Sequence, residues 1–565
     1  MKQLIECVPN FSEGRDMSVI KQITDEIEKV EGVKLLDVDP GAATNRTVVT
    51  IVGTPDEVLE AAFQAVKKAA EVIDMRHQKG EHPRFGATDV CPLVPVANIS
   101  MEETVEYARK LAERIGNETG VPVFCYENAA FTEERRNLAT CRSGEYEALP
   151  ERITTERWKP DFGPNEFTES VAKSGVTAVG ARDFLVAFNV NLNTTSTRRA
   201  NAIAFDVRER GRSKREGNPF TGPIVKDEKG KPVMIPGSLK AVKGIGWFIE
   251  EYGIAQISMN LTNISITPVH IAYDEVWKKA EARGIRVTGS ELVGLIPLEA
   301  MLDAGKYFLR KQKRSVGVDN DELIRIAAKS MGLSDLKPFD PKKSIIEFVL
   351  EDGSQKLVDM SVKDFANETA SESPAPGGGS IAASVGALGA SLATMVANLS
   401  SHKRGWDDRW EEFSDWAEKG QKYKDILLHL VDEDTNAFNK IMDAFGLPKK
   451  SDEEKKARKQ AIEDASKYAM EIPFKVMEEA YHSIQVIRAM AEYGNPNSVS
   501  DAGVGVLCAL TAVEGAYLNV KINAQGIADK KFTSDLLQRG SEIAEKAKDC
   551  RDAVMETVEQ RINEL

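Results

Sequence analysis

The sequence predicts a multidomain α+β protein in which two α/β subdomains of the split βαβ (ferredoxin-like) type precede an all-α helical bundle. Up to about residue 315, short β-branched runs alternate with amphipathic helical segments, a pattern typical of layered α/β structure. Two successive blocks, one ending near residue 175 and one beginning near Ala178, each fit the order strand, helix, strand, strand, helix, strand. After residue 380 long helical segments follow one another with short breaks, as in a bundle.

The expected elements of the first half justify this assignment. Helices are predicted over 55–73 and 101–115, the latter with Ser100 as N-cap and Glu103 three positions later, as in a capping box. The segment 211–237 is rich in Lys, Arg, Gly and Pro and is expected to be an exposed loop. The predicted strands cover residues 3–8, 33–38, 47–52, 121–126, 184–192, 254–261 and 285–288.

The second half begins with a connector and continues as helices. Over 316–362 we expect a short helical piece and a strand pair, 344–350 and 355–358, joined by a turn. The stretch 374–401 has no charged residue, but Ala, Gly and Ser dominate it, so a buried bundle helix is favoured over a membrane span. The helices expected after this connector cover residues 381–399, 409–445, 452–489, 502–524 and 531–563.

Length and composition limit the domain number and the class of protein. At roughly 150 residues per domain, 565 residues make about three or four folding units. We predict a first subdomain over 1–177, a second over 178–315, a linker over 316–362 and a helical domain over 363–565. Hydrophobic residues make up 42% and charged residues 29%, which excludes a wholly disordered chain.

The charge balance disfavours binding to polyanions in general. Lys plus Arg is 74 and Asp plus Glu is 88, so the formal net charge is −14. This excess of acid disfavours sequence-independent binding to nucleic acid or anionic lipid, and neither nucleic acid nor membrane is expected as a partner. An anionic ligand would therefore need basic residues that are concentrated locally.

The cysteines and the first residues indicate a cytoplasmic protein. Six cysteines are widely scattered, with no C-x-x-C motif and no disulfide-dense spacing, which favours a reducing compartment. The opening MKQLIECVPNFSEGRD has no basic segment followed by an apolar one, as a signal peptide would have.

His82 has the most informative surroundings of the six histidines. Pro83 favours an extended backbone at His82, so alternation projects His82 and Arg84 to the same side. Imidazole can take a proton from a reacting amine near neutral pH, and a guanidinium can hold a carboxylate through two hydrogen bonds. The alternative is a structural, hydrogen-bonded histidine in a tight loop.

Two nearby residues have competing interpretations. Asp39 ends a predicted strand, where α/β sheets often place ligand groups, although its place before Pro40 and Gly41, taken alone, favours a turn that begins at Asp39. Cys91 is close enough in sequence to His82 to suggest a nucleophile, but a buried, inert cysteine beside Pro92 is favoured. No cluster of His or Cys with metal-ligand spacing is present, so the sequence indicates no metal site.

In the helical half, Asp432, Glu433 and Asp434 form an acidic run on one predicted helix. Positions two apart on a helix point roughly 200° from each other, so Asp432 and Asp434 cannot both face one pocket. Asp434 precedes Phe438 by one turn, which favours a position toward the bundle interior, where desolvation raises a carboxyl pKa. The alternative is a solvated acidic face. The N–H groups of Gly377, Gly378, Gly379 and Ser380, at a predicted helix start, suit a carboxylate or another anion.

Two sets of motifs, one in each half, carry a resemblance to a known family. The N-terminal motifs are residues 8–15, 37–39, 80–92, 161–164 and 180–182, and the C-terminal ones are residues 375–380, 432–438 and 500–503. Over essentially its whole length the chain resembles the formiminotransferase-cyclodeaminase family, bifunctional folate enzymes of histidine degradation. The resemblance implies a transferase of two α/β subdomains followed by a helical cyclodeaminase, usually assembled into rings of dimers.

The resemblance also implies roles for particular residues. The transferase base corresponds to His82, with Asp39 as an orienting or proton-relay group, and the cyclodeaminase acid corresponds to Asp434. Arg84 or Arg182 is expected to hold a substrate carboxylate. The folate segment corresponds to residues 163–173 and includes Gly163, Pro164, Asn165, Glu166 and Phe167.

The activity implied by the resemblance has two steps. A formimino group moves from N-formimino-L-glutamate to N5 of tetrahydrofolate, and the product is cyclised to 5,10-methenyl-tetrahydrofolate with release of ammonia. Polyglutamylated tetrahydrofolate is the expected co-substrate, no metal or nucleotide is expected, and the chain is expected to form a homo-oligomer built from dimers. Two alternatives stay open: the helical domain also resembles methenyl-tetrahydrofolate cyclohydrolase, and the chain can be a non-catalytic folate-binding assembly protein.

Overall fold

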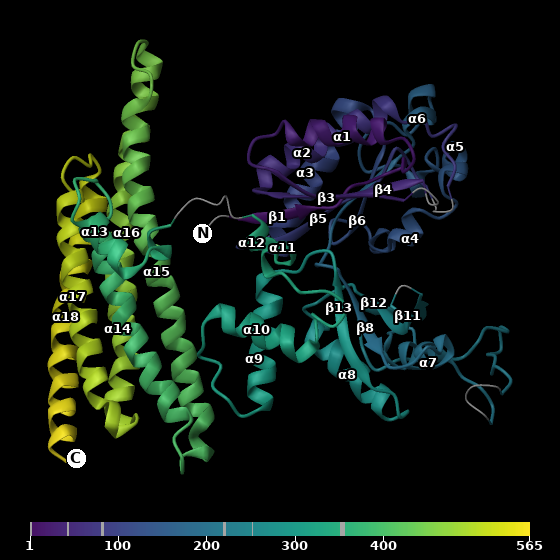
Figure 1. The fold of residues 1–565 in the computed structure, drawn as a ribbon. Coiled ribbons are helices and arrows are strands. Elements are labelled where there is room, and N and C mark those ends of the chain that lie inside the picture. The colour runs from purple at the N-terminus through teal and green to yellow at the C-terminus, as the bar shows by residue number, and fades with distance from the viewer. Residues whose placement is uncertain are drawn as a thin grey trace. The chain divides into compact units, whose positions relative to one another are not determined.

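The computed structural model describes residues 3–41, 45–80, 84–217, 222–250, 252–350 and 356–564 (Figure 1). The chain divides into two compact units. The first comprises Met1–Ala300 and Met331–Leu350, and the second comprises Met301–Ser330 and Glu351–Leu565. The first unit holds all the described β-sheets and the second is helical.

The first sheet begins with the predicted split βαβ order. Strands β3 (Lys34–Gly41), β4 (Arg46–Gly53), β1 (Leu4–Cys7) and β5 (Thr88–Ala97) lie side by side in this order, all antiparallel. The crossovers are α1 (Met17–Glu28) and α2 (Pro55–Val72). The short strand β2 (Asn10–Phe11) pairs with β4 and β5. This confirms the predicted fold class for the first block.

The first sheet continues beyond this order through β7 (Thr177–Ala181) and β6 (Val123–Glu127), which run parallel to β5. Helix α3 (Met101–Thr119) precedes β6 and has the predicted capping box at Ser100 and Glu103. Strands β5 and β7 are absent from the predicted set. Pro92 and Pro95 weaken the strand signal of β5, and β7 is a buried five-residue strand of mostly small residues with no alternation.

Strand β7 spans the predicted boundary between residues 177 and 178, so the first subdomain extends to Ala181. Between β6 and β7 the chain forms short helices only. These are η1 (Glu133–Arg136), α4 (Leu138–Cys141), η2 (Tyr146–Ala148), α5 (Leu149–Arg152), η3 (Glu156–Trp158) and α6 (Glu169–Ser174).

The second sheet repeats the split βαβ order. Strands β11 (Val242–Ile249), β12 (Ile254–Leu261), β8 (Val186–Leu192) and β13 (Val287–Val293) lie in this order, all antiparallel, with crossovers α7 (Thr197–Val207) and α8 (Val269–Glu281). The fold class is thus confirmed for the second block. The segment predicted as a loop over 211–237 is largely exposed but contains the strand pair β9 (Arg212–Ser213) and β10 (Met234–Ile235).

The strand pair predicted in the connector is wrong. Residues 341–349 form two helical turns, α11 (Pro341–Ser344) and α12 (Ile346–Val349), and Leu357–Asp359 forms the 3₁₀ helix η4. Asp340 caps α11 by accepting from Lys342 N–H, and Pro341 suits the first helical turn, so local capping outweighs the β-branched pair at Ile345 and Ile346. The predicted turn at 351–354 and the first residue of the predicted second strand, Gln355, lie outside the described residues.

Two helices that precede the helical domain cluster with it, and only the second, the short helical piece after residue 316, was predicted. Most of α9 (Leu298–Lys311) and all but the last residue of α10 (Asn320–Met331) belong to the second unit. Lys306 and Arg310 pair with Glu418 at 3.0 and 3.2 Å. The carbonyl of Gly317 accepts hydrogen bonds from Asn398 and Gln421.

The helical domain agrees closely with the prediction. Its short helix α13 (Val362–Thr369) is followed by α14 (Gly378–Ser401), α15 (Trp410–Gly446), α16 (Asp452–Tyr493), α17 (Val499–Asn523) and α18 (Lys530–Asn563), with 3₁₀ turns η5 (Asp407–Arg409) and η6 (Pro496–Ser498). Helices α15 and α16 extend together past the ends of the others (Figure 1).

Helix α14 contains the uncharged stretch and packs within the bundle. Ala382, Gly386, Ala390 and Thr394, spaced four residues apart on one helix face, are buried, and Gly389 lies against the carbonyl of Gly505 on α17. The segments Gly378–Ser401 and Pro496–Asn523 are both long and apolar enough to cross a membrane, but 61% and 50% of their most apolar windows are buried inside the protein. Burial of this kind is what a bundle helix requires.

Candidate active sites

Hydrogen bonds connect residues 78 and 79, which precede His82, to Asn45 at the start of β4. Asn45 donates from Nδ2 to the carbonyl of Lys79 (3.0 Å), and Gln78 donates from Nε2 to the carbonyl of Asn45 (2.8 Å). Gly14 N–H donates to Asn45 Oδ1 at 3.0 Å, so the motif at 8–15 supports the same junction. His82 itself lies outside the described residues, and its predicted role stays a prediction.

Asp39 is an exposed residue of β3, opposite Val48 of β4. The strand continues through Pro40 to Gly41, so the alternative of a turn beginning at Asp39 is wrong. The carboxylate therefore has the solvent access that an orienting or relay group needs. Because Asn45 joins the start of β4 to residues 78 and 79, the β3–β4 end of the sheet also adjoins the segment that leads to His82.

The Tyr146 ring contacts both Arg84 and Phe167. The guanidinium of Arg84 lies 5.1 Å from the centre of the Tyr146 ring, and the Tyr146 and Phe167 rings meet edge-on at 6.2 Å. Arg84 also donates to the carbonyl of Met75 (3.1 Å) and forms an ion pair with Glu147. A substrate carboxylate at Arg84 must therefore compete with Glu147 for the cation.

The predicted folate segment is held in place at its first residues. The carboxylate of Asp161 accepts from Cys125 N–H (2.8 Å) and pairs with Arg135 (2.5 Å). Gly163 has φ +81°, and a Cβ there would lie 2.8 Å from the Val121 carbonyl, so only glycine fits without strain. The next residues Asn165 and Glu166 are exposed, Pro164 is partly exposed, and all are available to a ligand.

Arg182 lies at the end of β7 in different surroundings from Arg84. Its backbone N–H donates to Leu93, and its guanidinium donates to the carbonyl of Asp183 at 3.0 Å. The nearby carboxyl of Glu6 is only 6% exposed, and burial raises its pKa to about 7 although the charge of Arg182 opposes this shift. Arg84 and Arg182 share no partner in the described contacts, so the structure does not join them in one carboxylate site.

A buried ion cluster in the first sheet escaped the sequence analysis. The carboxylate of Asp89, fully buried on β5, pairs with Arg46 and with Arg142 (2.8 Å). Arg46 also donates to Asn10 Oδ1 from Nε (3.0 Å). Oδ1 of Asp89 has no hydrogen-bond partner among the described residues. Only the polar pair Thr88 and Asp89 within an apolar run could have pointed to it.

Cys91 is buried, as expected of an inert thiol. Its sulfur lies 3.5 Å from that of Cys7, and both are free cysteines. Burial is the main cause that raises the pKa of Cys7 well above its usual value. A thiolate nucleophile is therefore disfavoured in this pair.

In the helical unit, Asp434 meets the glycine-rich start of α14. Oδ2 of Asp434 accepts from Ser380 N–H (2.8 Å) and from Ser380 Oγ–H (3.0 Å). A Cβ at Gly379 would lie 2.1 Å from Asp434 Oδ1, so the carboxylate approaches the helix backbone where only glycine leaves room. Burial raises the pKa of Asp434, while the two bonds from Ser380 oppose the shift.

The three acids of the run at 432–434 have three separate partners. Asp432 accepts from Leu357 N–H (2.6 Å), Glu433 accepts from the Tyr468 hydroxyl (2.7 Å), and Asp434 faces Ser380. This confirms that Asp432 and Asp434 face different surroundings. The reason given for the burial of Asp434 is wrong, because Phe438 is 38% exposed and α14 buries the carboxylate instead.

The glycines at the start of α14 have two neighbours. Helix α14 begins at Gly378, with Gly377 as its N-cap, three residues before the predicted start. The N–H of Ser380 donates a hydrogen bond to Asp434, so the protein's own carboxylate takes up part of the predicted anion site at this helix start. A Cβ at Gly378 would lie 3.2 Å from the Asn519 amide, which marks Asn519 of α17 as a further residue at this site.

The described residues contain no group of three or more His, Cys, Asp or Glu side chains arranged to hold a metal ion. The two candidate sites thus consist of carboxylates, arginines, aromatic rings and backbone amides. Such groups bind anions, hold planar rings and transfer protons.

Comparison with known proteins identifies both halves. Family models described as "Formiminotransferase domain, N-terminal subdomain", "Formiminotransferase domain" and "Formiminotransferase-cyclodeaminase" match residues 4–182, 187–351 and 361–542. The formimidoyltransferase-cyclodeaminase of Gallus gallus is 41% identical over 99% of this chain and 100% of its own length.

Shorter relatives match each half separately. The glutamate formimidoyltransferase of Thermoplasma acidophilum is 43% identical, over 54% of this chain and 92% of its own. The methenyltetrahydrofolate cyclohydrolase of Methylorubrum extorquens is 36% identical, over 36% of this chain and 98% of its own. The full-length match and the three family models together agree with the two motif sets, and the chain belongs to the formimidoyltransferase-cyclodeaminase family.

Proposed function

We propose that this protein transfers the formimino group of N-formimino-L-glutamate to N5 of tetrahydrofolate and then cyclises the product to 5,10-methenyl-tetrahydrofolate, releasing ammonia. The observation that carries the proposal is the match of one continuous chain, over 99% of its length, to formimidoyltransferase-cyclodeaminases. We assign transfer to residues 1–315 and cyclisation to residues 363–565. Histidine degradation is the route that this pair of reactions serves.

The transfer step needs a base. When N5 attacks the amidine carbon, the nitrogen becomes cationic. Removal of its proton, and return of a proton to the glutamate nitrogen, let the tetrahedral adduct expel glutamate as an amine. We assign this proton to neutral His82, with the exposed carboxylate of Asp39 as its orienting or relay group. Fastening of residues 78 and 79 to Asn45 supports a defined position for the segment that leads to His82.

Binding of the two substrates uses the groups around Tyr146 and β7. The pair of rings at Tyr146 and Phe167 offers a face against which a pterin or benzoyl ring can stack. Of the two arginines assigned to substrate carboxylates, Arg182 is the better placed, because Arg84 already has Glu147 as a partner. Residues Gly163 to Phe167 hold the folate beside these rings.

The cyclisation step needs an acid. N10 attacks the formimino carbon, and the resulting amino group leaves as ammonia once it has received a proton. Asp434 suits this role because burial raises the pKa of its carboxyl, so that a larger fraction is protonated near neutral pH. Ser380 and the N–H groups of Gly377 to Gly379 would orient the carboxyl group and bind the folate beside it.

Tetrahydrofolate is the co-substrate of both reactions, and we propose that its polyglutamylated form is the one used. We also propose that neither step needs a metal or a nucleotide. Each step exchanges one C–N bond for another at an activated amidine carbon and asks the protein only for proton transfer and positioning.

We further propose a cytoplasmic homo-oligomer built from dimers through the helical domain. Helices α14 and α17 expose large apolar side chains, including Leu388 (62%), Leu518 (64%) and Ile522 (61%). Apolar side chains gathered on neighbouring helices favour a self-complementary contact between two copies. Six free cysteines agree with a reducing compartment.

A second candidate function concerns the helical domain alone. Its 36% identity to a methenyltetrahydrofolate cyclohydrolase supports the alternative that this half opens the methenyl ring with water instead of closing it. Methenyl-folate absorbance separates the two, because a cyclodeaminase forms the chromophore from formimino-folate with ammonia release and a cyclohydrolase removes it. A non-catalytic folate-binding protein would do neither.

His82→Ala tests the proposal most directly. The variant is expected to lose transfer by about 10²–10⁴-fold, the usual contribution of a general base, and still to cyclise supplied 5-formimino-tetrahydrofolate. His77→Ala, an exposed histidine five residues earlier, is the matched control and is expected to keep full transfer. Full transfer activity in the His82 variant would defeat the assignment.

A further inference from the structure

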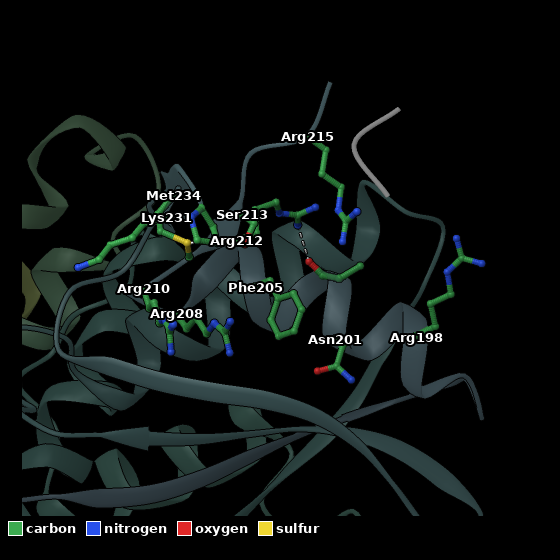
Figure 2. A pocket seen from close by; sticks show the side chains of 12 residues that line it. Arg198, Asn201, Phe205, Arg208, Arg210, Arg212, Ser213, Arg215, Lys231 and Met234 are labelled. Atoms are coloured by element: carbon green, nitrogen blue, oxygen red, sulfur yellow. Dashed lines mark hydrogen bonds between the residues drawn. The ribbon is translucent and has the colours of Figure 1, made fainter. Parts of the chain in front are cut away.

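The second subdomain contains a cavity of about 790 Å³ between α7 and the β9–β10 segment (Figure 2). Helix α7 contributes Arg198, Asn201, Ala202 and Phe205, whose spacing of three, four and seven places them on one face. The remaining walls come from residues 208–215 and 231–234, which follow α7 and, apart from residues 208–210, belong to the segment 211–237 that was expected to be an exposed loop.

The wall of this cavity is strongly basic. Six of its twelve lining residues are cations and none is acidic, the cations being Arg198, Arg208, Arg210, Arg212, Arg215 and Lys231. Figure 2 shows the Phe205 ring with Arg208 and Arg210 on one side and Arg198 on the other, and with Arg212, Arg215 and Lys231 above it. We call this feature the arginine cavity.

Among the described residues, most of these charges have no carboxylate partner. Arg208 donates to the carbonyls of Gly211 and Gly244, and Arg215 donates to the carbonyl of Gly222. Within the described part of the chain, Arg198 and Arg210 have no hydrogen bond or ion pair. Arg212 is the exception, because it pairs with Asp206.

Two glycines allow the backbone segments that carry these cations to approach each other closely. A Cβ at Gly211 (φ +66°) would lie 1.8 Å from the Ile235 carbonyl, and one at Gly237 would lie 2.0 Å from the Arg208 carbonyl. Burial and the nearby charge of Arg210 lower the pKa of Arg208, as expected where like charges gather. Like charges in one concave site repel each other unless an anion occupies it.

The local charge also contrasts with the rest of the molecule. The whole chain has a net charge of −14, so this basic cavity cannot be explained by a generally basic composition. A concave site of this volume fits a small molecule, whereas a nucleic acid needs an extended basic surface.

We propose that the arginine cavity binds a small polyanion, a molecule that carries two or more phosphate or carboxylate groups within reach of Arg198, Arg208 and Arg210. Guanidinium groups bind both kinds of oxyanion through paired hydrogen bonds. The anion has two sources: a free phosphorylated small molecule, or γ-linked glutamates attached to folate. Only the second source rests on the proposed function.

The test is calorimetric titration of the full-length protein with two probes, inorganic tripolyphosphate and tetra-γ-glutamate. We expect saturable binding of at least one probe, weakened by added salt because several ion pairs form. Whichever probe binds identifies the source. The variant R198Q/R210Q is expected to weaken that binding by about tenfold or more, since it removes two charge-assisted contacts.

The matched control is R199Q/K229Q, which removes the same charge from two exposed residues that do not line the cavity. It is expected to bind as the parent does. The proposal is overturned if neither probe binds to the parent, or if both double variants lose the same affinity. Transfer to monoglutamyl tetrahydrofolate, measured on the parent in parallel, would fail if the proposed function were wrong and is independent of the cavity.

Discussion

Asp434→Asn separates the chemistry of the second site from its architecture. In the parent, Asp434 Oδ2 accepts two hydrogen bonds from Ser380, at 2.8 and 3.0 Å. An asparagine has nearly the same shape, and its Oδ1 can still accept from Ser380 N–H, so the start of α14 stays tied to α15. What the variant loses is the proton that the carboxyl group can donate.

The expected size of the effect follows from this difference. Loss of a general acid lowers the rate by about 10²–10⁴-fold, whereas one hydrogen bond exchanged for another changes the free energy of unfolding by about 1 kcal/mol or less. Asp432→Asn is the matched control. Asp432 accepts from Leu357 N–H, away from Ser380, so this variant is expected to cyclise at the parent rate.

The assay starts from purified 5-formimino-tetrahydrofolate and follows methenyl-folate absorbance together with ammonia release. For the Asp434 variant we expect the substrate to accumulate. Cyclisation at the parent rate, in a variant that unfolds at the parent denaturant concentration, would show that another group supplies the proton.

The pH profile gives an independent readout of the same site. A carboxyl of raised pKa acts as an acid only while it is protonated, so the cyclisation rate is expected to fall as pH rises through that pKa. Ser380 Oγ–H lowers the pKa of Asp434, so Ser380→Ala is expected to move this fall to higher pH. A shift to lower pH would contradict the assignment.

Two further predictions concern the first unit. Gly163→Ala is expected to destabilise it in urea unfolding by about 1–2 kcal/mol for the positive φ and by roughly 1–3 kcal/mol more for the contact with the Val121 carbonyl. The control Gly120→Ala, at φ +70° with no atom within 4 Å of the added Cβ, is expected to show only the first loss. Equal losses in the two variants would refute the close contact at Gly163. Burial raises the pKa of Glu6 in the folded protein to about 7, from an ordinary value of 4.5. The unfolded chain therefore releases this proton first, and stability falls as pH rises between these values, by up to about 1.4 kcal/mol per pH unit. Glu6→Gln is expected to remove that slope in unfolding measured from pH 5 to 8, and an unchanged slope would assign it to other groups.

Local sequence signals predicted the elements that carry strong periodicity or caps. The five long helices of the second unit and the capping box at Ser100 agree with the structure because helical period and capping act over a few neighbouring residues. Prediction failed where the signal is not local. Strand β7 consists of five buried residues, and its place between β5 and β6 depends on pairing with segments far away in the chain.

The sequence by itself determined the fold class, the family and the pairing of two activities, because motifs and periodicity are written along the chain. The tertiary structure alone decided which partner each charged group meets. It joined Asp434 to Ser380 across 54 residues, paired Arg84 with Glu147, and gathered the basic side chains of α7 and β9 around one cavity. Such contacts form only when segments far apart in the chain pack against each other, and the spacing of residues along the sequence does not indicate which segments do so.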